Sequence, residues 1–211
     1  EWHSLRIRTD PRALIPRPET ELLADAAIVE IHDRLARGPA VAWEVATGSG
    51  AVAIAIAREV IAAAASPELV ATDISADALA VAAENLAAHG VAGVVTLELA
   101  DLLEPAGDTL PRPDVVVANL PYVASAEVDE RRGSLGFEPR VALDGGADGF
   151  DLLRRFVAEL PEKAARRATA FLELGVGQVD TIRSLAPAGA SVTVVPDLAG
   201  LDRVVRLDLP D

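Results

Sequence analysis

Apolar residues are distributed along the chain in two patterns, short nearly continuous runs and longer stretches with helical spacing. The short runs are rich in Val, Leu, Ile and Ala, as strands buried on both faces of a parallel sheet are. They predict seven strands, at residues 41–46, 69–74, 94–100, 114–120, 169–174, 191–195 and 203–209. Apolar positions three and four residues apart predict helices at residues 20–37, 51–65, 75–89, 150–160 and 178–185.

The order of these segments predicts an α/β fold with a mostly parallel seven-stranded sheet and helices on both faces. The last two strands follow each other without a helix, which predicts an antiparallel strand at one edge. We find no linker and no repeat, so we expect one domain over residues 1–211. Residues 1–37 would form an N-terminal extension and helix, and residues 38–211 a Rossmann-like core. Residues 121–149, rich in charge and glycine, are expected to be irregular.

Composition narrows the class of protein. No apolar run approaches the roughly 20 residues that span a bilayer, and no signal peptide opens the chain, so we expect a cytoplasmic protein without a membrane partner. The chain has no cysteine, and its three histidines are scattered, so we predict no metal site. It also has no methionine, and we expect the native chain to have a further segment before Glu1.

The formal net charge of −14 argues against a large nucleic-acid interface, because such interfaces are normally basic. Three arginine pairs are the candidates for a local basic patch. They are Arg131-Arg132, Arg154-Arg155 and Arg166-Arg167.

The turn after the first predicted strand has the composition of a ligand-binding loop. It reads Glu44-Val45-Ala46-Thr47-Gly48-Ser49-Gly50. Its glycines allow a ligand to approach the backbone, and the following helix begins with free N–H groups. The pattern fits a dinucleotide loop, an S-adenosylmethionine loop or a plain tight turn. It excludes a Walker-type phosphate loop, because no Gly-Lys-Ser/Thr follows.

Acidic residues end the next two predicted strands. Ligands bind at the carboxyl ends of the strands in open parallel sheets. Asp73 is therefore placed to accept hydrogen bonds from ribose hydroxyls, and Asp101 to meet an adenine amino group. Either carboxylate could instead cap the next helix. Suitable groups at three successive strand ends favour a nucleoside-containing cofactor.

The fourth predicted strand ends in Asn119-Leu120-Pro121-Tyr122. A buried Asn offers one carbonyl acceptor and two N–H donors, Pro stiffens the loop, and Tyr supplies a flat face for a planar group. The tetrapeptide therefore favours a site that holds a planar nitrogen group, with a simple turn as the alternative.

With these motifs the chain resembles class I methyltransferases, in which Asn-Pro/Leu-Pro-Tyr after the fourth strand marks enzymes that modify planar nitrogen. It more closely resembles the protein-glutamine methyltransferases of the HemK/PrmC type, which act on peptide chain release factors. The match covers nearly the whole chain and is carried by residues 14–21, 46–50, 119–123 and 137–149. Residues 14–21 and 137–146 are the specific ones, because general methyltransferases lack them.

The resemblance implies S-adenosylmethionine as the cofactor and gives each motif a role. The residues expected to bind the cofactor are Glu44, Ala46, Thr47, Gly48, Ser49, Gly50, Asp73, Ile74, Asp101, Leu102 and Asn119. The residues expected to bind the substrate are Pro18, Glu19, Thr20, Asn119, Leu120, Pro121 and Tyr122. Asn119 and the Pro121 backbone would accept the amide hydrogens, and Tyr122 would stack on the amide plane, so these three are the expected catalytic residues.

The chain departs from the family pattern in three ways. Ala46 replaces the usual first glycine, which costs little if its φ stays below zero. Leu120 replaces the usual first proline, as it does in the resembling rRNA adenine dimethylases. We expect the family's N-terminal helical domain to be absent from these 211 residues.

We therefore expect methyl transfer to the side-chain amide nitrogen of a glutamine in a peptide chain release factor. Three alternatives stay open: a glutamine of a ribosomal protein, an adenine amino group of nucleic acid, and a module that binds a cofactor or partner without catalysis.

Overall fold

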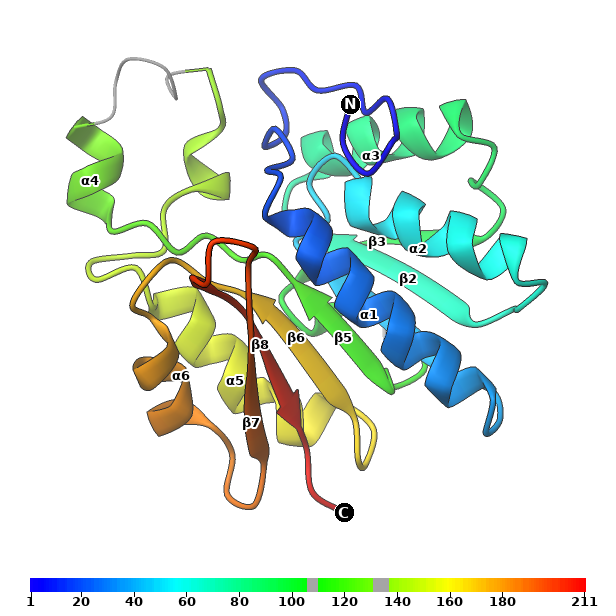
Figure 1. Ribbon diagram of the computed structural model, residues 1–211. Helices are drawn as coiled ribbons and strands as arrows, with labels where there is room; N and C mark the ends of the chain where they lie inside the picture. Colours follow the sequence, from blue (N-terminus) through cyan, green and yellow to red (C-terminus); the bar gives the residue numbers. More distant parts are fainter. Residues whose placement is uncertain (106–109, 131–136) are drawn as a thin grey trace.

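The computed structural model describes residues 1–105, 110–130 and 137–211, and they contain an eight-stranded sheet in the order β4-β3-β2-β1-β5-β6-β8-β7 (Figure 1). The five central strands β3, β2, β1, β5 and β6 are parallel to one another. The strands are β1 Val41–Val45, β2 Glu68–Asp73, β3 Val95–Asp101, β4 Glu104–Pro105, β5 Val115–Ala118, β6 Thr169–Glu173, β7 Ser191–Pro196 and β8 Asp202–Asp208.

All seven predicted strands are present, and the edge hairpin is confirmed. Strand β8 lies between β6 and β7 and is antiparallel to both. The eighth strand, β4, pairs antiparallel with the end of β3 and was not predicted. Two residues are too few to produce a hydrophobic period, so no sequence pattern could have indicated it.

The helices are α1 Thr20–Leu35, α2 Ala51–Ala62, α3 Ala76–Ala88, α4 Ser125–Glu130, α5 Asp151–Lys163 and α6 Val179–Leu185, with a 3₁₀ turn at Arg140–Ala142. Ser75 caps α3, since its hydroxyl accepts from the Ala78 N–H at 3.2 Å. Residues 121–149, expected to be irregular, contain α4 and the 3₁₀ turn. Residues 131–136, with the Arg131-Arg132 pair, lie outside the described residues.

Two apolar cores flank the sheet. Successive strand residues alternate between them: Val115 and Val117 pack with α1 and α2, while Val116 and Ala118 pack with α5 and α6. Figure 1 shows these two helix layers on opposite sides of the sheet. Because both faces are covered at the centre of the sheet, β1, β2, β5 and β6 are buried almost throughout, and their polar side chains concentrate at the strand ends.

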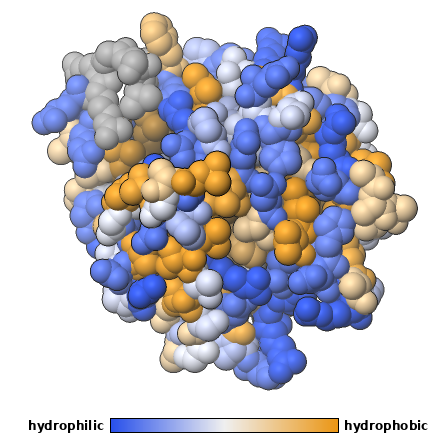
Figure 2. Space-filling view, in the orientation of Figure 1, coloured by the Kyte–Doolittle hydropathy of each residue, from blue (hydrophilic) through white to orange (hydrophobic). Residues whose placement is uncertain are grey.

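The edge hairpin leaves apolar surface uncovered. Figure 2 shows apolar residues gathered over β7 and β8, and the turn between these strands exposes Leu198 and Leu201. Within the part of the chain that the structure describes, no helix is both long and apolar enough to cross a membrane.

Candidate active site

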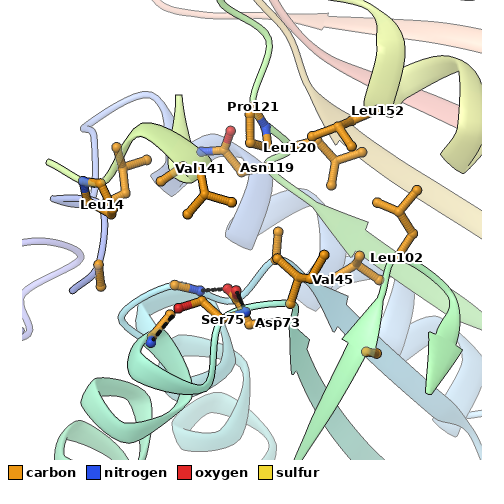
Figure 3. A pocket seen from close by; sticks show the side chains of 18 of the residues that line it. Leu14, Val45, Asp73, Ser75, Leu102, Asn119, Leu120, Pro121, Val141 and Leu152 are labelled. Atoms are coloured by element: carbon orange, nitrogen blue, oxygen red, sulfur yellow. Dashed lines mark hydrogen bonds between the residues drawn. The ribbon is translucent and has the colours of Figure 1, made fainter. Parts of the chain in front are cut away.

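A pocket opens at the carboxyl ends of β1, β2, β3 and β5, and we call it the strand-end pocket (Figure 3). Its lining includes Val45, Ala46, Gly48, Asp73, Ile74, Ser75, Ala100, Asp101, Leu102, Asn119, Leu120 and Pro121. Leu14, Val141 and Leu152 close it from segments that are distant in sequence. The structure thus brings together the predicted residues of four strand ends, because parallel strands place these ends along one edge.

Asp73 ties the glycine loop to β2. One carboxylate oxygen accepts from the Gly48 N–H at 2.9 Å, and the other accepts from the Ser75 N–H at 2.9 Å. Burial raises the pKa of Asp73 above its ordinary value, and these backbone hydrogen bonds offset part of that rise. The predicted acid is therefore at the pocket wall, and part of its hydrogen-bonding capacity shapes the loop.

Glu44 lies behind the glycine loop and does not line the strand-end pocket. Its carboxylate accepts from the Thr47 hydroxyl at 2.6 Å and from the Ala53 N–H at 2.9 Å. Burial raises its pKa to about 8. Thr47 and Ser49 line a neighbouring cleft together with Thr20 and Asn119. Gly50 is the N-cap of α2, and a Cβ there would lie 3.1 Å from the Ala82 side chain.

Ala46 does not keep φ below zero, so the condition under which alanine would cost little here is not met. Its φ is +59°, in the left-handed region that favours glycine, and Leu102 on the next pocket wall has φ +55°. Each such non-glycine residue costs about 1–2 kcal/mol. The strain is tolerated because the residues on both sides of Ala46 are fixed by β1 pairing and by the Thr47 N–H bond to the Thr72 carbonyl at 2.9 Å.

Asp101 lines the strand-end pocket but is half exposed and pairs with Arg155 at 2.9 Å. Because its side chain is half exposed, Asp101 lies at the rim of the pocket and not at its floor. Arg154 pairs with Asp148 and with Asp151, and Arg167 pairs with Asp211. Three of the four arginines in the described pairs, Arg154, Arg155 and Arg167, therefore face carboxylates of the same chain.

Asn119 separates the strand-end pocket from a second pocket, which we call the acceptor pocket. Its lining includes Leu14, Arg17, Asn119, Leu120, Pro121, Tyr122, Val123, Ala142, Leu143 and Glu173. The Asn119 Nδ2 donates to the Thr20 hydroxyl at 3.1 Å. Burial and the Glu173 carboxylate raise the pKa of Tyr122 to about 12, so its phenol stays protonated.

None of the three residues predicted from the 14–21 segment lines either pocket, but Thr20 reaches the site through its hydrogen bond with Asn119 and lines the neighbouring cleft. Pro18 and Glu19 lie outside both pockets as the described residues define them. Glu19 instead precedes α1 as its N-cap and lies 3.8 Å from Arg203. Arg17 takes their place, because it lines the acceptor pocket and pairs with Glu138 at 2.6 Å.

Residues 143–149 form a turn that packs on the tetrapeptide loop. Val123 donates to the Leu143 carbonyl at 3.1 Å, and Gly145 donates to the Val123 carbonyl at 2.8 Å. A Cβ on Gly145 would lie 2.7 Å from the Pro121 carbonyl oxygen, and one on Gly149 would lie 2.5 Å from the Tyr122 carbonyl oxygen. Glycine is needed at both positions because two backbones meet there.

Sequence reasoning missed two residues that hold the loops in place. Asn85 of α3 donates to the carbonyls of Ser49 and Arg8, at 2.8 and 2.9 Å, so it joins the glycine loop to the N-terminal segment. Gln178 donates to the Tyr122 carbonyl at 3.1 Å and accepts from the Gly175 N–H at 2.9 Å. Asn85 could have been suspected, because a polar residue between Val81, Ala82 and Leu86 falls on the apolar face of its helix.

The chain is similar to several bacterial proteins named release factor glutamine methyltransferase. It is 36% identical to the enzyme of that name from Cereibacter sphaeroides, over 97% of this chain and 70% of that protein. The chain belongs to the release factor glutamine methyltransferase family. No protein family model matches it.

Solved structures agree with this membership. The release factor-specific protein-(glutamine-N5) methyltransferase from Alicyclobacillus acidocaldarius is 27% identical with a TM-score of 0.50, over 97% of this chain and 99% of that one. A ribosomal protein L11 methylase from Lactobacillus delbrueckii subsp. bulgaricus is 21% identical with a TM-score of 0.64, over 97% and 86% of the two chains. The likeness to the methylase shows that the fold is that of class I methyltransferases.

Among the described residues, no group of three or more His, Asp or Glu side chains is arranged to hold a metal ion.

Proposed function

We propose that this chain transfers a methyl group from S-adenosylmethionine to the side-chain amide nitrogen of a glutamine in a peptide chain release factor. The observation that carries the proposal is the position of Asn119, which borders both the strand-end pocket and the acceptor pocket. A donor held in one pocket and an amide held in the other would meet at this residue. Residues 1–211 would act as one catalytic domain, in the cytoplasm, where release factors work.

The strand-end pocket suits the nucleoside part of S-adenosylmethionine. Its walls are mostly apolar, with Ile74, Leu102 and Leu152 able to flank a flat base, and Asp73 is its buried acid. A carboxylate between two apolar walls would accept from ribose hydroxyls, and Asp101 at the rim would face the base edge. Ala46, Gly48 and the neighbouring loop would hold the amino-acid part. When bound, the cofactor supplies a methyl group already activated by its sulfonium.

The protein's own task is to hold a poor nucleophile in place. The lone pair of an amide nitrogen is delocalised into its carbonyl. We infer that Asn119 and the backbone at Pro121 accept the amide N–H bonds and raise the electron density on nitrogen, while Tyr122 stacks on the amide plane. Positioning of this kind supplies up to about 7–11 kcal/mol of barrier lowering. The proton is lost after transfer, so no strong base is required before it.

Replacing Asn119 with Ala tests the proposal. We expect methyl transfer to fall about 100-fold or more, because the acceptor and its alignment are both lost. The affinity for S-adenosylmethionine should change little, because most of that pocket is built by other strand ends. The measurements are transfer of tritiated methyl to purified release factor, and calorimetric titration with the cofactor.

The same assay separates the rival substrates. Purified release factor, ribosomal protein and rRNA are offered in parallel, and only the release factor is expected to acquire label. Label on the ribosomal protein or on rRNA alone would reject the substrate assignment. Cofactor binding without transfer to any of the three would support a module without catalysis.

A further inference from the structure

A buried carboxylate next to Asn119 has no role in the mechanism so far. Strands β5 and β6 are parallel, with Ala118 opposite Leu172, so the next residues, Asn119 and Glu173, emerge side by side at the strand ends. Glu173 is only 2% exposed, yet it lines the acceptor pocket. Within the described residues its Oε2 atom has no hydrogen-bond partner, and its Oε1 receives only a long 3.5 Å bond from the Tyr122 hydroxyl. A buried acceptor left this open is costly unless it serves the site.

The position of Glu173 bears on the orientation of the Asn119 side-chain amide, which the shape of the amide does not determine. The two ends of the Asn119 amide are nearly the same size, but one donates and the other accepts. The Nδ2 end donates to the Thr20 hydroxyl at 3.1 Å, and Asn119 and Thr20 both lie close enough to the Glu173 carboxylate to lower its pKa. No hydrogen bond among the described residues uses the Oδ1 end. An ionised carboxylate can only accept, so a reversed amide would set two oxygens against each other.

We propose that Glu173 is a positioning residue that fixes the Asn119 amide with Nδ2 toward the protein and Oδ1 free for the substrate. This inference rests on the proposed function, in which Asn119 accepts a substrate N–H. It also gives the site a means of selection. With Oδ1 facing the substrate, the site accepts hydrogen bonds from the NH₂ group of a glutamine side chain. A glutamate side chain has no N–H to donate, and its carboxylate would face the oxygens of Asn119 and the Pro121 backbone.

The groups around Glu173 determine when it is ionised. Burial raises the pKa of Glu173, and the Glu19 carboxylate raises it further. The polar groups of Thr20 and Asn119 and the charge of Arg203 lower it without cancelling the effect of burial. Tyr122 faces it as a neutral phenol, and Arg17 lines the same pocket. A protonated Glu173 could donate to Oδ1 and allow the amide to reverse, so activity should fall as pH drops through this raised pKa.

The first test replaces Glu173 with Gln, which keeps the shape but can donate as well as accept. We expect kcat for the release factor to drop roughly 10- to 100-fold, with the affinity for S-adenosylmethionine unchanged within about twofold. The acid limb that we expect in the wild-type pH profile should disappear. Thr20→Val, which removes the other acceptor for Nδ2, should lower kcat by a smaller factor. Glu30→Gln is the matched control, because Glu30 is a buried carboxylate near Thr169 at the opposite end of β6.

A second readout does not depend on activity. The ¹⁵N resonance of the Asn119 side-chain amide should shift with pH in the wild type, as Glu173 titrates, and should stay constant in the Glu173→Gln variant. If kcat is unchanged in that variant, or the resonance shows the same pH response in both proteins, Glu173 does not position Asn119. If the resonance behaves as expected but wild type transfers no methyl group to the release factor, the positioning stands and the substrate assignment fails.

Discussion

At the scale of single residues, the site depends on side chains and backbone conformations that carry a free-energy cost. Glu44, Asp73 and Glu173 are buried carboxylates at strand ends, and burial raises the pKa of each. Ala46 and Leu102 hold left-handed backbone conformations on two walls of the strand-end pocket. Such features gather where a site fixes its geometry in advance.

The raised pKa of Glu44 predicts a pH-dependent stability. In the folded state its pKa is about 8, against an ordinary value of 4.5. Between these values the folded protein binds a proton that the unfolded chain releases, so the free energy of unfolding falls as pH rises through this range. Glu44→Gln should remove this contribution. Thermal unfolding at pH 5 and pH 8 should show a smaller decrease in Tm for the variant than for wild type, and equal decreases would contradict the assignment.

The strain at Ala46 predicts that glycine is better there for stability. Relief of the left-handed conformation gives about 1–2 kcal/mol, and the extra freedom of glycine when unfolded costs about 0.5–1 kcal/mol. We expect Ala46→Gly to stabilise the protein by roughly 0.5–1 kcal/mol in urea unfolding. Ala83→Gly, at an exposed position inside α3, should instead destabilise it by a similar amount. Loss of stability in both variants would mean that Ala46 is not strained.

At the scale of elements, the active site is assembled by contacts between loops. Segment 143–149 hydrogen-bonds with the tetrapeptide loop, and Gln178, at the N-terminus of α6, donates to the same loop. Asn85 joins the glycine loop to the N-terminal segment. Helix α1 is fixed on the sheet by Glu30, which pairs with Arg34 at 2.7 Å and with Arg206 of β8 at 2.9 Å.

The close approach at Gly145 predicts a loss of activity that does not require unfolding. In Gly145→Ala the new Cβ would meet the Pro121 and Gly149 carbonyl oxygens at 2.7 Å, and because both are backbone atoms the loop must shift. We expect methyl transfer to fall about 10- to 100-fold, with a smaller effect on cofactor binding. Gly93→Ala is the control, because a Cβ there meets nothing within 4 Å and activity should be retained. Full activity of Gly145→Ala would show that the Pro121 backbone is not part of the site.

At the scale of the whole molecule, the charge distribution bears on whether the substrate is a protein or RNA. The chain has 33 acidic and 19 basic residues, and three of the four arginines in its described pairs face carboxylates of the same chain. Phosphate contacts need free cations, so this distribution disfavours RNA as the substrate even though Leu120 is found in adenine methyltransferases.

This charge distribution predicts weak binding to RNA. We expect the dissociation constant for an rRNA fragment at physiological salt to be weaker than about 10⁻⁴ M, the upper limit of ordinary non-specific binding. Fluorescence anisotropy with a labelled fragment measures it, with the purified release factor as the positive comparison. Micromolar, salt-sensitive binding would return adenine methylation to consideration.

Sequence alone was sufficient wherever the determinant was local. Hydrophobic periods predicted seven strands and the five longer helices, Ser75 was identified as a cap, and the motifs at the strand ends predicted the loops that meet at one edge. These features depend on residues close together in the chain, and parallel strands then fix where their ends lie. The specific family segments, including residues 137–146, could be recognised but not explained.

Only the tertiary structure decided which distant groups touch. It placed Glu173 beside Asn119, turned Ala46 to positive φ, moved Pro18 and Glu19 away from the pockets, and set Gly145 against the Pro121 carbonyl. None of these follows from composition or period, because each depends on strand register or on the packing of two loops. The physical reason is that hydrophobic periodicity specifies which face of an element is buried, whereas the partner of a polar side chain is set by how separate elements dock.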